Sequence, residues 1–537
     1  MLRIILPSLI FAVLTGNAYA CETAELIKRM SSNPNLPPII LTRPISQNNW
    51  NAPGGIFKIH YDTEGPNTVY NVDEDINPLD GIPDYVNRAS DYLNYAHSIY
   101  INDLGFDPPP PDDEVDNDGL YDVYLTNVAA LTTPENLSHY YPGREAYTSY
   151  MQLGHDLRTP HYPDDPLPFL KVCAAHEYFH AVQFAYRAYS SDQTPWWFEA
   201  CAGWAEEIVF DEINDVYYKL DYYLPNLHKS LYQSEGFFTY GTWIYAQFLS
   251  DRFGVSVIRK CWEKFASFDF AVDAVDLTLD TYGADFNDEY SKHIVWNYFT
   301  GDNYQPGFYE EAADFGETVY EAMIHSGYPV DWTTDPIPQE NVSGVYIIFQ
   351  NISLVNGSLV IEYLNTTDDK HGIAIAQIRP DVGVTYDIHL VQNYIINIYV
   401  VENFSLCEKV VMMPIWLYEG NPSSGITSYS YCAYIDSSSA GIAENIPPIP
   451  FDFAIKDVYP NPFNGATNIS FTSPFEGYCD FVVYGITGDK IYEKKEPVAI
   501  GYNYIQWSPS DDVASGAHFF EIIQSDKRIH GKFVYLK

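Results

Sequence analysis

The chain has 537 residues, 46% of them hydrophobic, and its 28 Lys and Arg stand against 72 Asp and Glu, which gives a formal net charge of −44. This length predicts two to four domains, and the composition excludes a globally disordered chain. The negative charge repels phosphate backbones and anionic lipid head groups, so we expect no nucleic acid and no membrane surface as partner.

The N-terminus has the pattern of a secretory signal. A basic start, an apolar run and the small-residue sequence Ala18-Tyr19-Ala20 predict a signal peptide at residues 1–20, cleaved before Cys21. No later stretch offers about 18 uninterrupted apolar residues, so we expect no transmembrane segment after signal cleavage. The mature protein is therefore expected to be secreted.

All seven cysteines follow the predicted cleavage site, in a compartment that permits disulfides. Because seven is odd, at least one thiol lacks a partner within the chain. Cys407 with Cys432, and Cys173 with Cys201, are plausible disulfides, and buried free thiols are an equal alternative.

The remaining chain divides into four regions. Residues 21–50, rich in Pro and Asn, are predicted to be an N-terminal extension, and a first domain is predicted over 51–330. The strands and helices expected in this domain lie at 56–61, 84–102, 121–125, 170–189, 196–210 and 240–253. Strands followed by a helical half indicate an α+β fold.

Short alternating strands such as 345–349 and 359–363 predict a β-sandwich accessory domain over 333–446. The proline-rich stretch 447–450 is expected to be a stiff linker. A last all-β module is predicted over 451–537.

An acidic loop precedes the second strand of the first domain. Carboxylates stand at positions 1, 3, 5 and 9 of a calcium-type loop, with Gly119 at position 6, but the Glu expected at position 12 is replaced by Leu125. The loop at 75–84 fits the pattern less well. The candidate Ca²⁺ ligands are Glu114, Asp116, Asp118 and Asp122. A plain solvated turn is the alternative.

The strongest chemical signal is His176-Glu177-Tyr178-Phe179-His180 in the helical half. Residues four apart lie on one face of a helix, so both imidazoles can share one Zn²⁺ while Glu177 reaches a metal-activated water. Two helix histidines that merely form hydrogen bonds are the alternative.

Zinc in such a site needs a third protein ligand. Glu199 follows His180 after eighteen intervening residues, within the apolar and aromatic segment 196–210. Burying a carboxylate there is costly unless a cation compensates it, which makes Glu199 the candidate third ligand. A solvent-facing Glu199 is the alternative.

HExxH followed by eighteen residues and Glu resembles the gluzincin metallopeptidases. Residues 196–202, WWFEACA, are similar to the Trp-x-x-Glu-Gly-x-Ala motif of the aminopeptidase-type members, with Ala200 in place of Gly. Thermolysin-like members have an Asp four residues after the ligand Glu, and this chain has Gly203 there. We therefore do not expect the hydrogen bonds by which that Asp orients the metal ligands. The resemblance implies Zn²⁺, a general base at Glu177 and an oxyanion donor, for which Tyr240 is the candidate.

The wider arrangement resembles a family of secreted, uncharacterised metalloproteases. The similarity rests on the motifs at 59–63, 80–86, 176–184 and 240–241 and covers about residues 55–330. It implies a zincin-like catalytic domain and names no substrate.

The last module resembles a type IX secretion sorting domain. The similarity begins at Val458-Tyr459-Pro460-Asn461-Pro462, continues through 483–488 and 501–507, and ends at 532–537. It implies a small, Ig-like β-sandwich that export machinery recognises, with delivery to the cell surface or the extracellular space. An ordinary adhesive sandwich is the alternative.

Taken together, these patterns predict a secreted zinc metallopeptidase that hydrolyses protein or peptide substrates with Glu177 as general base. The alternative is a surface adhesion or binding protein whose zinc site is structural or inactive.

Overall fold

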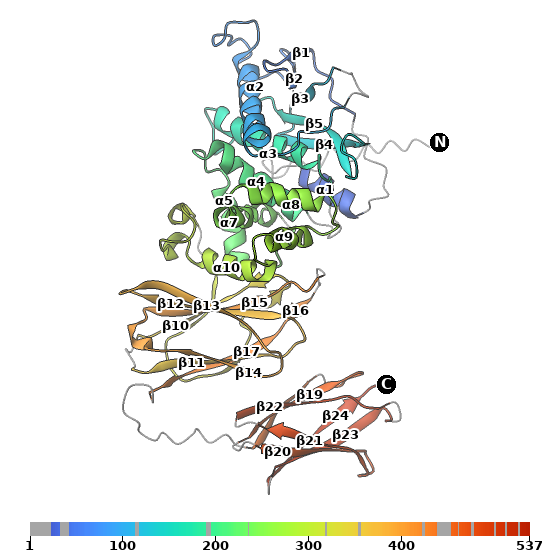
Figure 1. Ribbon diagram of the computed structural model, residues 1–537, viewed down its shortest axis with the longest axis vertical. Coiled ribbons are helices and arrows are strands. Elements are labelled where there is room, and N and C mark those ends of the chain that lie inside the picture. Colours follow the sequence, from blue (N-terminus) through green and yellow to red (C-terminus); the bar gives the residue numbers. More distant parts are fainter. Residues whose placement is uncertain are drawn as a thin grey trace.

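A computed structural model gives the fold (Figure 1). The residues that it describes are 23–32, 42–112, 118–189, 195–234, 236–316, 319–352, 356–420, 425–437, 453–459, 461–473, 477–498, 501–510, 513–524 and 527–537. The predicted signal peptide, Cys21 and the proline-rich linker therefore lie outside the described residues.

The chain combines helices with several β-sheets, which confirms the α+β class. Its first sheet has the strand order β1-β2-β3-β5-β4, with β2, β3 and β5 parallel and the two outer strands antiparallel to their neighbours. The strands are β1 (Asn48–Asn51), β2 (Phe57–Tyr61), β3 (Tyr121–Thr126), β4 (Ala130–Ser138) and β5 (Ala146–Gly154). The antiparallel strand β4 thus forms one edge of this sheet.

Helices follow and surround this sheet. They are α1 (Thr23–Ser32), α2 (Asp84–His97), α3 (Leu167–Gln183), α4 (Trp196–Phe210), α5 (Tyr217–Tyr223), α6 (Phe238–Gly241), α7 (Trp243–Phe253), α8 (Ser256–Phe265), α9 (Ala271–Asp280) and α10 (Phe286–Tyr298). Figure 1 shows most of them between the five-stranded sheet and the next β-rich layer. The single helix expected at 240–253 is two helices, because α6 ends at Gly241 and α7 begins at Trp243.

The described parts of the N-terminal extension expected at 21–50, residues 23–32 and 42–50, belong to the folded domain. Helix α1 places Ile27 in the main core with no exposed surface, and β1 pairs with β2 from Asn48 onward. The sequence shows little of this, because α1 is short and its apolar residues are few.

The β-sandwich begins with β6, before the boundary expected at 333. One sheet has the order β13-β12-β15-β10-β6, with β9 beside β15, and the other has the order β14-β11-β17-β7. The strands, including the small pair β8 and β16, are β6 (Glu321–His325), β7 (Val330–Thr334), β8 (Gln339–Glu340), β9 (Ser343–Gly344), β10 (Tyr346–Gln350), β11 (Ser358–Asn365), β12 (His371–Arg379), β13 (Gly383–Leu390), β14 (Ile396–Val401), β15 (Lys409–Trp416), β16 (Ile426–Thr427) and β17 (Tyr429–Asp436).

The outer face of the first sandwich sheet packs on α10 and continues the core of the helical domain. Tyr346 donates a hydrogen bond to the carbonyl of Ile294 at 2.7 Å, and Tyr290 donates one to the carbonyl of Val342 at 2.9 Å. The helical domain and the sandwich therefore share one hydrophobic core, and the sandwich is more than an appended module.

The C-terminal domain has its own core around Phe471, Trp507 and Phe533. Its two sheets have the orders β18-β19-β22 and β21-β20-β23-β24. The strands are β18 (Ala454–Tyr459), β19 (Thr467–Ser473), β20 (Gly477–Tyr484), β21 (Lys490–Val498), β22 (Gly501–Trp507), β23 (Gly516–Gln524) and β24 (Lys527–Tyr535).

The two plausible disulfides are absent. Cys173, Cys201, Cys407 and Cys432 are all buried free thiols. The Cys432 thiol lies beside Glu362 of β11, whereas the Cys407 thiol lies beside β12 of the other sandwich sheet. Cys201 lies among aromatic side chains of the helical core. The alternative of buried thiols is therefore the one that the structure adopts.

Candidate metal centre

Helices α3 and α4 supply the three predicted ligands. The HExxH segment lies in the second half of α3, where the four-residue spacing stacks the rings of His176 and His180 with centroids 4.8 Å apart. Glu199 lies in the first turn of α4, which begins directly after Pro195. All three side chains are buried.

The ligand atoms form a compact triangle. The two Nε2 atoms of His176 and His180 lie 3.1 Å apart, and each lies 3.3 Å from an oxygen of the Glu199 carboxylate. Two ligands about 2.0–2.1 Å from a tetrahedral zinc ion are separated by roughly 3.3 Å. The donor set and its spacing thus fit Zn²⁺.

Glu199 has an electrostatic reason to hold a cation. Its side chain has no exposed surface, and neither carboxylate oxygen accepts a hydrogen bond within the part of the chain that the structure describes. Burial raises the pKa of this carboxyl, but the imidazoles of His180 and His176 outweigh burial and lower the pKa to about 2. The buried group is therefore ionised, and a divalent cation would compensate it.

Glu206 orients the first imidazole. Its Oε1 lies 2.6 Å from Nδ1 of His176 and accepts a hydrogen bond from the ammonium of Lys219 at 2.9 Å. Burial lowers the pKa of His176, but contacts with Glu199 and Glu206 raise it to about 10. A carboxylate on Nδ1 fixes the ring and leaves Nε2 to face the metal, as is common for metal-binding histidines.

Gln183 orients the imidazole of His180. Its Oε1 lies 2.8 Å from Nδ1 of His180, and its Nε2 donates to the carbonyl of Phe198 at 2.9 Å. The amide therefore connects a ligand on α3 with the backbone beside the ligand on α4. The sequence did not predict three of these residues, Glu206, Lys219 and Gln183, because no motif names them. Only Glu206 had a signal, since it follows Glu199 by about two turns in the same predicted helix.

The Glu177 carboxylate is hydrogen-bonded to strand β4 and to helix α1. Its Oε2 accepts hydrogen bonds from the hydroxyls of Thr132 at 2.7 Å and Thr23 at 2.9 Å. The Thr23 hydroxyl also accepts a bond from the Thr132 backbone amide at 2.7 Å. Among the described residues no donor reaches Oε1 of Glu177, so this oxygen is the one left to take a proton.

A pocket opens beside this centre. His176, Glu177 and Tyr240 line it together with Ala129, Ala130 and Tyr218. Tyr240, the predicted oxyanion donor, lies in α6 and keeps 8% of its surface exposed. The structure therefore brings Tyr240 to the same pocket as His176 and Glu177, and it adds Tyr218, which the sequence did not single out.

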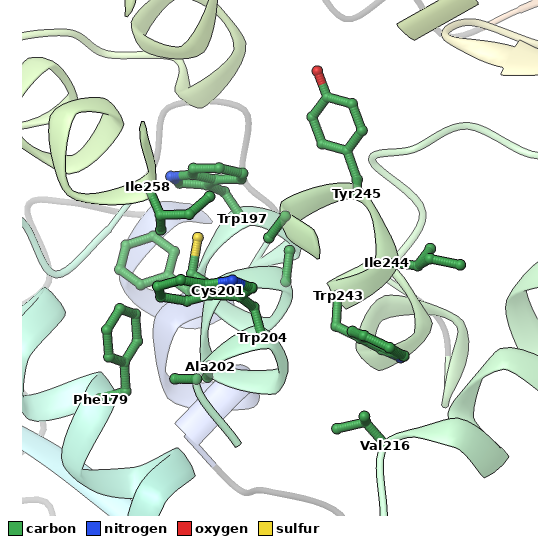
Figure 2. Packing of buried hydrophobic residues seen from close by; sticks show 14 of the residues in the cluster. Phe179, Trp197, Cys201, Ala202, Trp204, Val216, Trp243, Ile244, Tyr245 and Ile258 are labelled. Atoms are coloured by element: carbon green, nitrogen blue, oxygen red, sulfur yellow. The ribbon is translucent and has the colours of Figure 1, made fainter. Parts of the chain in front are cut away.

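Close packing holds α4 in place. Figure 2 shows Phe179 and Trp243 on either side of this helix, which carries Trp204, and the rings of Phe179 and Trp204 lie 6.0 Å apart. A Cβ atom added to Gly203 would lie 2.7 Å from the Cβ of Trp243. An Asp at this position, as in thermolysin-like enzymes, would not fit, and Glu206 fulfils the orienting role one turn later.

The predicted calcium loop is only partly described. Glu114 and Asp116 lie outside the described residues. Asp118 forms an ion pair with Lys58 at 2.7 Å, and Asp122 is 1% exposed and forms ion pairs with Arg43 and His60. Asp122 is thus engaged by Arg43 and His60, and Arg43 also pairs with Asp112 and Glu135. Calcium binding by this loop stays a prediction.

Two parts of the chain match known families. Residues 168–324, which include the three candidate metal ligands, match a family of unknown function, DUF6055. Residues 457–536 match the secretion system C-terminal sorting domain. No curated protein matches the chain.

Solved structures with local similarity are only distantly related. The Yersinia pseudotuberculosis-derived mitogen is 14% identical, covering 22% of this chain and 92% of that chain, with a TM-score of 0.16. The FMN-binding β-glucuronidase of Faecalibacterium prausnitzii L2-6 is 11% identical, covering 36% of this chain and 32% of that chain, with a TM-score of 0.15. The Parabacteroides merdae β-glucuronidase is 8% identical, covering 36% and 28%, with a TM-score of 0.15. Scores this low carry no argument about the fold or the function of this chain.

The sorting match agrees with the structure of the last domain, whose strands β18 to β24 occupy residues 454–535. Within the described part of the chain, no helix has both the length and the apolar character needed to cross a membrane. The C-terminal region is a type IX secretion sorting domain, and the protein is exported by that machinery to the cell surface or the extracellular space.

Proposed function

We propose that this protein is a zinc-dependent metallopeptidase of the gluzincin type. The observation that carries the proposal is the triangle formed by His176, His180 and Glu199, with edges of 3.1 to 3.3 Å and a buried carboxylate that has no hydrogen-bond donor among the described residues. A structural zinc site has four protein ligands, whereas three ligands leave one position open for chemistry. The described residues supply three.

Zn²⁺ in this site would act as a Lewis acid toward a substrate carbonyl and an attacking water. Glu177 lies in the same pocket with one free carboxylate oxygen, so it can accept a proton from water and return it to the leaving amine. The hydroxyls of Thr132 and Thr23 hold the other oxygen and fix the orientation of the carboxylate. Tyr240 is the candidate donor to the developing oxyanion.

The position of β4 supports a peptide substrate. This strand forms the edge of the five-stranded sheet, and Ala129 and Ala130 at its start line the pocket beside Glu177. An extended peptide can add to a sheet edge through backbone hydrogen bonds, with its side chains placed alternately in and out of pockets. The Thr23 hydroxyl already binds the backbone amide of Thr132, so such a peptide would pair with β4 outside this residue.

The Glu177→Gln variant tests the proposal. We expect about one zinc ion per chain in both the wild type and the variant, because the substitution leaves the three ligands in place. We expect peptide hydrolysis to fall by about 10²–10⁴-fold, the usual contribution of a general base. Zinc content is measured by mass spectrometry, and cleavage is measured on a mixed peptide library.

Glu212→Gln is the matched control, because Glu212 is 62% exposed and, among the described residues, forms an ion pair with Lys171 alone. Full activity is expected in this variant. Undiminished cleavage by Glu177→Gln would refute the assignment. Zinc binding by the wild type without any cleavage would favour the alternative, a surface binding protein with a structural metal site.

A further inference from the structure

The other end of α4 carries a second group of carboxylates that zinc chemistry does not use. We propose that Glu207, Asp211 and Glu311 form a calcium site. An all-carboxylate donor set suits a hard cation such as Ca²⁺, whereas zinc in proteins prefers nitrogen and sulfur ligands. The site lies outside both acidic loops that the sequence pattern indicates.

The geometry allows one ion to bridge all three side chains. One oxygen from each of Glu207, Asp211 and Glu311 lies within 4.8 Å of the other two. Oxygen ligands at 2.3–2.6 Å from the same Ca²⁺ are separated by at most about 5 Å. The three side chains can therefore bind a single cation with little rearrangement.

Glu207 supplies an independent reason for a cation. Only 7% of its surface is exposed, and within the described residues its carboxylate has neither a hydrogen-bond donor nor an ion-pair partner. The hydroxyl of Tyr217 donates to Glu311, and the nearby ammonium of Lys219 is bound to Glu206. A buried carboxylate among like charges is costly, and a divalent cation would offset that cost.

The helix end adds to the attraction. Helix α4 ends at Phe210, Asp211 is its C-terminal capping residue, and its last turn contains no basic residue. The unpaired carbonyls at a helix C-terminus carry partial negative charge and are normally balanced by Lys, Arg or His. A bound Ca²⁺ would take that role here.

The site would link distant parts of the fold. Glu311 directly precedes the short 3-10 helix η4 (Ala312–Asp314), whereas Glu207 and Asp211 end the helix that carries Glu199. Calcium would therefore link the C-terminal end of α4 to the segment that precedes η4. Because the protein is exported, it meets the millimolar calcium concentrations at which extracellular modules of modest affinity are occupied.

Thermal unfolding of the full, zinc-loaded chain in calcium-free and in 5 mM calcium buffer (a concentration of order ten times a typical extracellular Kd) tests this site. We expect calcium to raise the Tm of the wild type by several degrees, and to raise that of Glu207→Gln by less than one degree. Glu310→Gln, which alters the exposed neighbour of Glu311, should respond like the wild type. Zinc content should be unchanged in all three proteins, which separates this outcome from a failure of the zinc assignment.

Terbium gives a second readout that does not depend on a buried substitution. Tb³⁺ replaces Ca²⁺ at oxygen sites, and the phenol of Tyr217 beside Glu311 should sensitise its luminescence. We expect Asp211→Asn, a change at an exposed residue, to weaken the calcium-displaceable signal at least tenfold. Equal calcium responses of the wild type, Glu207→Gln and Asp211→Asn would overturn the proposal.

Discussion

The two ends of helix α4 carry buried glutamates whose pKa values shift in opposite directions. At the N-terminal end, Glu199 has two imidazole neighbours, and the pKa of its carboxyl is lowered to about 2. At the C-terminal end, burial together with the charges of Glu206, Glu311 and Asp211 raises the pKa of Glu207 to about 9. Both side chains are at least nine-tenths buried, so burial by itself does not decide the charge.

The comparison shows that the partners of a buried carboxylate determine what it can do. Glu199 is ionised before any metal arrives, because His176 and His180 already lie beside it. Glu207 keeps its proton at neutral pH unless a cation replaces that proton. One helix therefore carries an ionised carboxylate beside two imidazoles at one end and, at the other, a carboxyl group whose ionisation depends on its ligand.

Removing one of the two imidazoles beside Glu199 should have the largest effect on zinc binding and activity. In His180→Ala we expect the zinc content to fall from about one ion per chain to near zero and peptide hydrolysis to disappear, since two protein ligands hold zinc poorly. Glu199 would then resemble Glu207, a buried carboxylate without enough positive charge nearby. Metal analysis of the purified variant measures the effect.

His139→Ala is the control, because this histidine is exposed and lies far along the chain from the ligands. It should retain both zinc and activity. Stoichiometric zinc in His180→Ala would show that the triangle is not the metal centre.

An intermediate effect is expected at Glu206, which contacts His176 and whose charge also raises the pKa of Glu207. Glu206→Gln should weaken zinc binding by about 10- to 100-fold, the usual cost of losing a carboxylate on a ligating imidazole. Competition with a fluorescent zinc chelator measures this affinity. Because the role of Glu206 is to position His176, activity at saturating zinc should recover most of its value.

Glu212→Gln again provides the matched control, with no change in zinc affinity. An unchanged affinity in Glu206→Gln would mean that the 2.6 Å contact with His176 is incidental.

The smallest effect should be a pH dependence of stability that originates from Glu207, at the C-terminal end of α4. An exposed Glu in the unfolded chain has a pKa of about 4.3, and the folded value for Glu207 is about 9. Between these values the folded state binds the extra proton, so stability should fall as pH rises from about 5 to 9 in calcium-free buffer. Charges facing Glu207 come from Glu206, Asp211, Glu311 and Lys219, of which only Lys219 opposes the shift.

Tm measured across this pH range should fall by a few degrees more in the wild type than in Glu207→Gln. Saturating calcium should remove most of the difference, because a bound cation keeps the carboxylate ionised at every pH. The same pH profile in both proteins would show that Glu207 is not the group responsible.

Local patterns in the sequence predicted the parts of the site that lie within one helix. The four-residue spacing of His176 and His180 requires only helical geometry, and the helix expected at 196–210 begins and ends as expected. The contacts between elements were not predicted. Glu206 on His176 and Thr23 on Glu177 depend on how α1, α3 and α4 approach one another, and no periodicity records that approach.

By itself, the sequence determined the α+β class, the export domain at the C-terminus and three candidate metal ligands, because each follows from local spacing or from a contiguous motif. Only the tertiary structure decided that these side chains meet, that the six cysteines it describes stay unpaired, and that α1 belongs to the folded domain. It also decided which buried carboxylates are charged. The reason is physical: ionisation and metal geometry depend on distances of a few ångströms between residues that are far apart along the chain.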